Sequence, residues 1–290
     1  MARRVLRILL VMLLLLAPKF AFANLRVISL YPGHSDNIAA LAGEKSRDIL
    51  VALSENDDAD FLSEVPRVSL RVGAEKLLSM KPDLIVTRPF AEKLNPNLYS
   101  VLRSSGVKIL SIEPPTWENF PEYLQNLADE LQLDAKPALE KLANLKREIA
   151  VKAKSQKAKS HDGKILNVFV ESTGREIHTC APDSWAAKLL ELSGANNVAK
   201  NASAIRPGSS IAAFGIERVL ESVNSGLDVY IIQTGAMNHT NLAEFYARSW
   251  TLALKNSGVR VVEVPEKYLS RPSLLGLEIG GNLLLKIFWE

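Results

Sequence analysis

The sequence predicts an α/β fold made of two lobes that flank one long α-helix. Three observations indicate this fold. Short apolar stretches alternate with helix-like stretches through the first half of the chain, which is the pattern of parallel strands covered by helices. An uninterrupted helical pattern then fills residues 136–160, and the alternation starts again after it.

In the first half, the apolar stretches predict strands and the stretches between them predict helices. Residues 25–30 are apolar, Pro32 and Gly33 interrupt them, and Ser35 is a suitable cap for the next helix. Further strands are expected at 48–53, 84–86 and 107–112, and further helices at 74–80 and 98–104.

The stretch 136–160 reads as one continuous helix. Asp134 is a suitable cap, and Pro137 fits the first helical turn because its missing N–H is not needed there. Apolar residues then recur at spacings of three and four, which places them on one face: Leu139, Leu142, Leu145 and Ile149. The helix would be about 37 Å long, at about 1.5 Å per residue.

The second half repeats the alternation. Strands are expected at 165–170, 229–232 and 259–264, and helices at 184–192 and from Pro272 to about 288, with Gly280-Gly281 as a weak point of the last helix. The stretch 217–220 also resembles 75–78, since each begins a short helix that precedes an Asp and an apolar strand. This internal similarity supports two related lobes.

The first 23 residues have the pattern of a secretory signal. Three arginines precede a nine-residue apolar run, Ile8 to Leu16, and small residues stand before the expected cleavage after Ala23. Asn24 occupies the place where a lipoprotein has its cysteine, so we expect a periplasmic chain without a lipid anchor. The expected divisions are a signal segment 1–23, an N-terminal lobe 24–135, a connecting helix 136–160 and a C-terminal lobe 161–290.

Composition excludes several classes of function. Cleavage after Ala23 removes four basic residues and lowers the formal net charge from +3 to about −1, so nothing indicates nucleic-acid binding. Cys180 is the only cysteine, which rules out an intramolecular disulfide. The sequence contains no Gly-x-Ser-x-Gly and no His-Glu-x-x-His motif, so an exported hydrolase is a weak alternative.

Four stretches follow one another in a recognisable order. Residues 26–32 form a strand that enters a short loop, and residues 75–86 combine an acidic helix start with Lys-Pro-Asp and an apolar strand. The long helix 136–160 comes next, followed by the helix and loop of residues 185–198. Together they resemble the iron-chelate and cobalamin type of periplasmic substrate-binding proteins of ABC importers, over nearly all of residues 25–288.

This resemblance implies two Rossmann-like lobes joined by one long α-helix, with a ligand cleft between the lobes. It also implies a monomer without catalytic activity or an intrinsic cofactor, whose ligand is a metal chelate. We expect an iron chelate of the ferric siderophore type. Cobalamin or another corrinoid and haem are the alternatives; cobalamin is disfavoured because Ser69 and Ile211 stand where a corrin would need bulky rings.

The ends of the strands predict part of the ligand site, because ligands of parallel α/β sheets bind outside the carboxyl ends of the strands. This rule selects Tyr31, Pro32, His34 and Arg88 in the first half and residues 171–175, including Arg175, in the second half. The resemblance adds further expected ligand contacts: His178, Trp185, Phe214, Tyr268 and Arg271.

Each of these residues also has an ordinary structural interpretation. Tyr31 and Arg88 can be exposed surface residues, His34 a helix-start residue, and Trp185 an anchor of its helix. Arg88 is the sharpest candidate because a guanidinium suits an anionic chelate. The histidines and Tyr31 have no recognisable metal-ligand spacing, so no metal site of the protein itself is predicted.

Glu75 and Glu217 have a different expected role. They match the two acidic surface residues of the resembled family, one on each lobe, which engage the two transmembrane subunits of the ABC permease. The alternative is that each carboxylate stabilises the first turn of its own helix. Their equivalent positions in the two halves favour docking.

Overall fold

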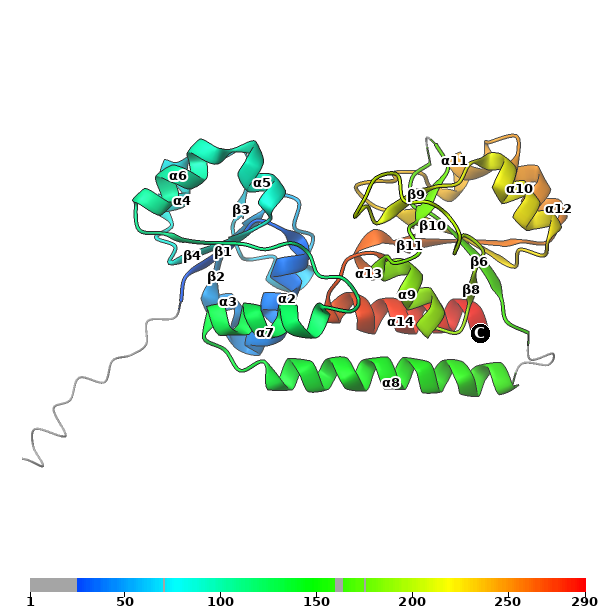
Figure 1. Cartoon of the computed structure of the whole chain (residues 1–290), viewed down its shortest axis with the longest axis horizontal. Helices are drawn as coiled ribbons and strands as arrows, with labels where there is room; N and C mark the ends of the chain where they lie inside the picture. The colour runs from blue at the N-terminus through cyan, green and yellow to red at the C-terminus, as the bar shows by residue number, and fades with distance from the viewer. Residues whose placement is uncertain (1–24, 70, 160–163, 175) are drawn as a thin grey trace, which may run out of the picture.

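The computed structural model describes residues 25–69, 71–159, 164–174 and 176–290, so the expected signal segment 1–23 lies outside the described residues. The chain forms two α/β lobes side by side, and a long helix runs beneath both (Figure 1). This arrangement confirms the predicted fold class. No helix in the described ranges has the length and apolar character needed to cross a bilayer.

The N-terminal lobe is built on a five-stranded parallel sheet. Its strand order is β3-β2-β1-β4-β5, and every neighbouring pair is parallel. The strands are β1 (Val27–Ser29), β2 (Leu50–Ser54), β3 (Arg67–Val68), β4 (Leu84–Thr87) and β5 (Lys108–Ser111).

Helices cover both faces of this sheet (Figure 1). One face carries α2 (Pro32–Ala42), α3 (Ser46–Ile49) and α7 (Phe120–Leu131), and the other carries α4 (Ala74–Ser79), α5 (Pro89–Leu94) and α6 (Pro96–Ser104). The short 3₁₀ turns are η1 (Gly43–Lys45) and η2 (Asp60–Leu62). Alternate residues of a strand face opposite sides, and accordingly Val27 and Ile28 belong to different apolar clusters.

The C-terminal lobe repeats this plan with a four-stranded parallel sheet of order β11-β10-β6-β8. An antiparallel pair, β7 and β9, lies beside it. The strands are β6 (Asn167–Glu171), β7 (His178–Cys180), β8 (Asn196–Asn197), β9 (Ile211–Ala213), β10 (Val229–Thr234) and β11 (Arg260–Pro265).

The helices of this lobe again cover two faces (Figure 1). On one side lie α10 (Ile216–Asn224), α11 (Leu242–Tyr246) and α12 (Thr251–Asn256). On the other lie α9 (Trp185–Leu192), α13 (Glu266–Leu269) and α14 (Leu274–Trp289). Tyr230 and Ile231 of β10 face these two sides in turn and join separate clusters.

Helix α8 (Lys136–Lys159) is continuous and corresponds to the stretch expected to connect the lobes. Leu142 and Ile149 are buried on the face that packs against the rest of the chain. Ile149 also explains a glycine of α14: a Cβ on Gly281 would lie 2.3 Å from Ile149 Cδ1, so a larger residue would displace the Ile149 side chain. The expected weak point in the last helix is therefore a close contact between α8 and α14.

One local expectation is wrong. Ser35 does not cap the first helix, because α2 already begins at Pro32 after an extended Tyr31. Proline fits this first position well, since its fixed φ is helical and no N–H is lost. The Ser35 hydroxyl lies inside the helix and donates to Ser29 Oγ at 2.9 Å. The serine therefore connects α2 to β1.

A continuous apolar cluster joins the two lobes. It contains side chains of α7 from the N-terminal lobe, of α9 from the C-terminal lobe, and of α8 and α14. Trp185 of α9 lies at this junction, with ring centroids 4.8 Å from Trp117 and 5.1 Å from Phe120. A large apolar contact of this kind opposes independent motion of the lobes.

Candidate functional site

Tyr31 and Arg88 meet at the carboxyl edge of the N-terminal sheet. Tyr31 follows β1 and Arg88 follows β4, and these two strands are parallel neighbours. The guanidinium carbon of Arg88 lies 4.3 Å from the centroid of the Tyr31 ring. A cation over an aromatic face is attracted by the negative potential of the ring, so the pair holds its own geometry.

The guanidinium of Arg88 has no acceptor among the residues that the structure describes. It lies over the Tyr31 ring, and within the described ranges no carboxylate pairs with it and no hydrogen bond engages its N–H groups. Arg88 is only partly buried. Five N–H donors and one positive charge are therefore available to an anion at this edge.

The Tyr31 phenol is held in its protonated form. Burial raises the pKa of the phenol above its ordinary value, and the charges of Arg88 and Arg271 only partly oppose this. A neutral phenol is a hydrogen-bond donor. Tyr31 would have to lose this proton before its oxygen became a phenolate ligand of a metal.

The Tyr31 ring lies against the backbone of Gly33, next to Arg271 of the C-terminal lobe. A Cβ at Gly33 would lie 2.8 Å from Tyr31 Cε1 and 3.5 Å from Cγ of Arg271. The carboxylate of Glu266, also in the C-terminal lobe, acts electrostatically on the Tyr31 phenol. Tyr31 therefore stands where the two lobes come together.

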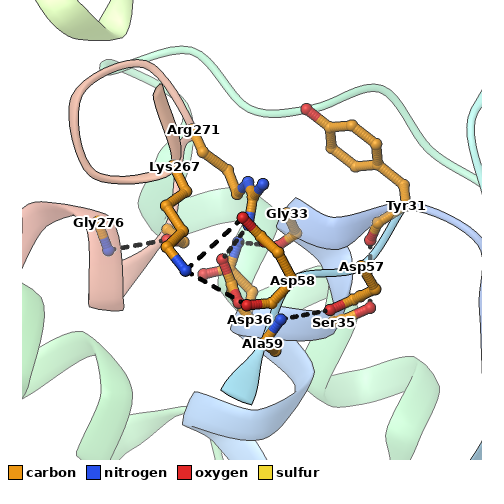
Figure 2. A network of polar contacts seen from close by, with 12 residues as sticks. Tyr31, Gly33, Ser35, Asp36, Asp57, Asp58, Ala59, Lys267, Arg271 and Gly276 are labelled. Atoms are coloured by element: carbon orange, nitrogen blue, oxygen red, sulfur yellow. Dashed lines mark hydrogen bonds and ion pairs between the residues drawn. The ribbon is translucent and has the colours of Figure 1, made fainter. Parts of the chain in front are cut away.

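A network of charges links the lobes beside this point (Figure 2). Arg271 Nη1 donates to Asp58 Oδ1 at 2.7 Å and lies 3.5 Å from Asp36 Oδ2. Lys267 Nζ lies 3.7 Å from Asp58 and 4.0 Å from Asp60. We call Asp36, Asp58, Asp60, Lys267 and Arg271 the interlobe charge cluster. Its carboxylates come from the N-terminal lobe and its cations from the C-terminal lobe.

The interlobe charge cluster borders a pocket of about 190 Å³ between the lobes. Leu275 and Ile279 of α14 form part of its wall, together with Tyr268 of α13. Arg271 is largely buried and already satisfies two carboxylates, so its charge is neutralised by the protein. This distinguishes Arg271 from Arg88.

The pKa values of two carboxyl groups of the cluster shift in opposite directions, because Arg271 outweighs burial at only one of them. Burial raises the pKa of Asp36 to about 6, although the Arg271 charge opposes the shift. Burial would also raise the pKa of Asp58, but the hydrogen bond and charge of Arg271 prevail and lower it. Arg271 therefore pairs more strongly with Asp58, and Asp36 is the group that accepts a proton first.

The raised pKa of Asp36 predicts a specific pH dependence of stability. A folded-state pKa of about 6 against 3.8 gives stabilisation that is complete below pH 3.8 and is lost as the pH rises through 6. We expect Asp36→Asn to gain up to about 3 kcal/mol in free energy of unfolding, relative to the unchanged protein, between pH 4 and pH 6. Urea unfolding at several pH values measures this difference.

Asp60→Asn is the matched control, because the Asp60 side chain is 97% exposed. The difference in free energy of unfolding between Asp60→Asn and the unchanged protein should vary little over the same pH range. If the difference in free energy of unfolding between Asp36→Asn and the unchanged protein did not change with pH, the raised pKa of Asp36 would be contradicted.

His34 lies in the protein interior. Its side chain is fully buried, with Nδ1 2.7 Å from the Tyr123 hydroxyl and Nε2 3.1 Å from the carbonyl of Ile112. Because a carbonyl only accepts, Nε2 carries the proton and Nδ1 accepts from Tyr123. Burial lowers the pKa of His34 to about 4, so the ring is neutral. Both nitrogens are occupied, and His34 connects α2 to α7 and to the end of β5.

Trp185 and Phe214 are also packed inside the protein. Trp185 is 4% exposed within the apolar contact between the lobes, as its interpretation as a helix anchor expects. Phe214 is 9% exposed and packs on Phe169 at 4.8 Å, while the Arg218 guanidinium covers its ring at 4.2 Å. In this conformation neighbouring side chains cover most of both rings.

The other expected contacts are more accessible. His178 in β7 is partly buried, with Nδ1 2.8 Å from Thr173 Oγ1 and Nε2 3.6 Å from Glu176. Pro32 is the first residue of α2 and is partly buried. Tyr268 is partly buried, with Lys267 Nζ 5.3 Å from its ring centroid. Arg175 lies outside the described residues.

The two expected docking residues are exposed at matching places. Glu75 lies in the first turn of α4 and Glu217 in the first turn of α10. Both helices lie on the side of the molecule opposite α8 (Figure 1).

Sequence reasoning did not find the interlobe charge cluster. Asp58 and Arg271 are 213 positions apart in the chain, and no local pattern pairs them. It also placed residues 171–175 at the ligand edge without detecting that the Glu171 side chain is fully buried. The strand-end rule locates an edge of the sheet but does not say which side chains point outward.

The periplasmic binding protein family matches residues 32–259 of the chain. The vitamin B12-binding protein of Vibrio parahaemolyticus is 28% identical over 189 residues, which are 64% of this chain and 65% of that protein. An uncharacterised ABC transporter substrate-binding lipoprotein of Bacillus subtilis is 24% identical over 182 residues, 60% of this chain and 55% of that protein. The matched stretch thus spans less than two thirds of the length of these relatives.

Solved structures have the same fold. A possible iron-binding periplasmic protein of Staphylococcus epidermidis has a TM-score of 0.70 at 19% identity, covering 91% of this chain and 98% of that one. The periplasmic heme-binding protein HutB of Vibrio cholerae has a TM-score of 0.68 at 19% identity, covering 92% of this chain and all of that one. The vitamin B12-binding protein BtuF of Vibrio cholerae has a TM-score of 0.60 at 22% identity, covering 91% of this chain and 96% of that one.

Proposed function

The chain belongs to the periplasmic binding protein family, and we propose that it captures a metal chelate for an ABC importer. The proposed ligand is an anionic iron chelate of the ferric siderophore type, which the protein delivers to the membrane permease. The protein binds and releases this ligand without chemistry. The proposed location is the periplasm, reached through a cleaved signal segment 1–23 and without a lipid anchor at Asn24.

The observation that carries this proposal is the guanidinium of Arg88, which pairs with no residue in the part of the chain that the structure describes. It lies at the ligand-binding edge of a parallel sheet, fixed over Tyr31, where the C-terminal lobe approaches. A positive charge with free donors at this place suits the carboxylate or other anionic group of a chelate. The proposed ligand contacts are Tyr31, Arg88, Pro32, Tyr268 and His178.

Cobalamin or another corrinoid is the second candidate. The relatives from three Vibrio species are named as vitamin B12-binding proteins. Haem is compatible with the same edge, because the solved structures include periplasmic heme-binding proteins and Arg88 can bind a propionate. The free charge of Arg88 favours a ligand with an anionic group over a neutral one.

A binding panel tests the proposal. Purified residues 24–290 are titrated with ferric siderophore chelates, hemin and cyanocobalamin, and tryptophan fluorescence is recorded. We expect saturable quenching by an anionic chelate and no turnover of it. Tight binding of cyanocobalamin alone would establish the second candidate, and no binding of any member would overturn the proposal.

The proposed partners are the two transmembrane subunits of an ABC permease, docked through Glu75 and Glu217. Exposed charges on both lobes can steer such an encounter without touching the ligand. We expect the double variant Glu75→Ala/Glu217→Ala to retain ligand affinity and to impair uptake by cells. The control is Glu140→Ala/Glu148→Ala, which removes two exposed acids of α8, on the opposite side of the molecule. Normal uptake by the first double variant would contradict the docking role.

A further inference from the structure

The C-terminal lobe contains a fully buried carboxylate at the carboxyl end of β6. The Glu171 side chain has no exposed surface, and four hydrogen bonds hold it. Arg248 donates to its two oxygens at 2.7 and 3.3 Å, the Tyr230 hydroxyl donates at 2.6 Å, and the Asn238 amide donates at 3.1 Å. Glu171 therefore has neither the exposure nor the free acceptors to bind a ligand.

These bonds join segments that are distant in the chain. Arg248 lies between α11 and α12, and its Nη2 also donates to Thr240 Oγ1 at 2.8 Å. Asn238 and Thr240 belong to the loop 235–241 between β10 and α11. We call Glu171, Tyr230, Asn238, Thr240 and Arg248 the C-lobe clamp.

A glycine permits the close packing of this clamp. A Cβ at Gly174 would lie 2.5 Å from both Arg248 Nη2 and Thr240 Oγ1, and 2.9 Å from Glu171 Oε1. The chain after β6 thus runs directly against the ion pair. Only a residue without a side chain fits there without displacing the clamp.

The loop 235–241 reaches toward the proposed ligand site. A Cβ at Gly235 would lie 2.6 Å from Glu266 Oε2, and the Met237 amide donates to the same carboxylate at 3.4 Å. Glu266 in turn acts on the Tyr31 phenol across the gap between the lobes. The side chain of Met237 is 55% exposed on this loop. The loop thus contacts Glu266, whose charge acts on Tyr31, and it carries an exposed apolar side chain.

Burying an ion pair is costly, because two charges lose their hydration. Apolar side chains of similar volume often give equal or greater stability at such positions. A buried pair does, however, enforce one arrangement of the segments that it joins, since either charge is strongly destabilised if its partner moves away. The C-lobe clamp has this character, with donors from two loops converging on one carboxylate.

We propose that Glu171 and Arg248 are positioning residues that hold the loop 235–241 as a preformed wall of the ligand cleft. They touch no ligand themselves. The order of the loop follows from the contacts of the clamp alone, whereas its effect on ligand affinity rests on the proposed function.

Hydrogen exchange followed by mass spectrometry tests the proposal on residues 24–290 without any ligand. For Arg248→Ala we expect exchange of the 235–241 amides to rise about tenfold or more, at a temperature where the protein stays folded. Arg248→Lys should give a smaller rise, because an ammonium keeps the charge but not the planar pair of donors. Arg103→Ala removes the exposed ion pair to Glu92 in the other lobe and serves as the control.

A second variant covers the case in which Arg248→Ala does not fold. Asn238→Ala removes the hydrogen bond between the loop and Glu171, together with the bond that the Asn238 side chain accepts from the Thr240 amide, and it leaves the ion pair intact. It should raise exchange in 235–241 alone, and the amides of this loop other than that of Thr240 are the ones that report on the clamp. A lower melting temperature with unchanged loop exchange, in either variant, would show that the clamp only stabilises the lobe and would overturn the proposal.

The effect on binding is measured with the same ferric chelates, hemin and cyanocobalamin. We expect the affinity of folded Arg248→Ala for the bound probe to fall several-fold, with partial recovery in Arg248→Lys. Unchanged affinity despite a loosened loop would overturn the role in the cleft. If no probe binds the unchanged protein, the proposed function fails, while the exchange result still decides whether the clamp positions the loop.

Discussion

Arg88→Ala is expected to weaken binding of an anionic chelate about 10- to 100-fold, the usual effect of losing charge-assisted hydrogen bonds. The reason is that the Arg88 guanidinium has no competing acceptor among the described residues, so its donors are available to the ligand. The protein should keep its stability, since the side chain of Arg88 is only partly buried and pairs with no carboxylate of the described residues. Isothermal titration with the chelate that binds best provides the measurement.

Two matched variants make this result interpretable. Arg88→Lys retains the charge but loses the planar donors, so its affinity for the chelate should lie between those of the unchanged protein and of Arg88→Ala. Arg103→Ala removes an arginine of the same lobe whose charge Glu92 already pairs, and it should bind normally. If Arg88→Ala bound the chelate as tightly as the unchanged protein, Arg88 would be excluded from the site.

Trp185→Ala is expected to cause the largest loss of stability, about 3–5 kcal/mol, as is usual when a buried tryptophan is truncated to alanine. Trp185 is 4% exposed and packs on Trp117 and Phe120, which both precede the connecting helix. Its removal leaves a cavity in the contact between the lobes. The free energy of unfolding comes from urea titration, and the distance between spin labels on the two lobes reports their separation.

Trp250→Ala is the control, because Trp250 packs on Tyr230 and Phe245 within the C-terminal lobe. It should lower stability without broadening the distance between the lobes. Trp185→Phe should retain most of the packing and also removes an indole N–H that is buried without a partner among the described residues. For Trp185→Ala we expect a broader distribution of distances between the lobes. A distribution as narrow as that of the unchanged protein would contradict the proposed role of this contact.

The two lobes are held by contacts of different kinds. The apolar cluster around Trp185, α8 and α14 lies on one side, and the interlobe charge cluster lies nearer to Tyr31. Apolar packing does not depend on pH, whereas Asp36 changes its charge near pH 6. We therefore expect acid to alter the region around Arg271 first and to leave the long helices in contact.

The sequence predicts the regular part of this fold well, for physical reasons. Buried parallel strands need continuous apolar runs, and these runs locate β4, β6 and β10 to within a few residues. The stripe at Leu139, Leu142, Leu145 and Ile149 identifies α8 because a helix of this length needs one apolar face. Such signals are local and can be read from neighbouring residues.

Other features depend on contacts that a single sequence does not display. Helix α7 was not predicted, although Phe120, Leu124 and Leu127 form its buried face. The antiparallel pairing of β7 with β9 joins His178 to Ala213, and short strands of this kind carry little periodicity. Gly280 and Gly281 lie inside a continuous helix, and the close approach of Tyr268 and Ile149 explains why both residues are glycines.

The candidate site shows the same division. Tyr31 and Arg88 were predicted as ligand contacts because strand ends are visible in the sequence, and the structure adds that they contact each other. That His34 is buried while Arg88 is unpaired depends on distant partners, Tyr123 for the one and none among the described residues for the other. The pairing of Arg271 with Asp58 likewise requires both lobes in place.

The most direct measurement is a crystal structure of residues 24–290 with the tightest-binding metal chelate, with data collected at the absorption edge of its metal. We predict one anomalous peak between the lobes, with an anionic group of the chelate within hydrogen-bond distance of the Arg88 guanidinium and beside Tyr31. A chelate bound on the outer surface of either lobe, or one between the lobes with Arg88 still free of it, would contradict the account.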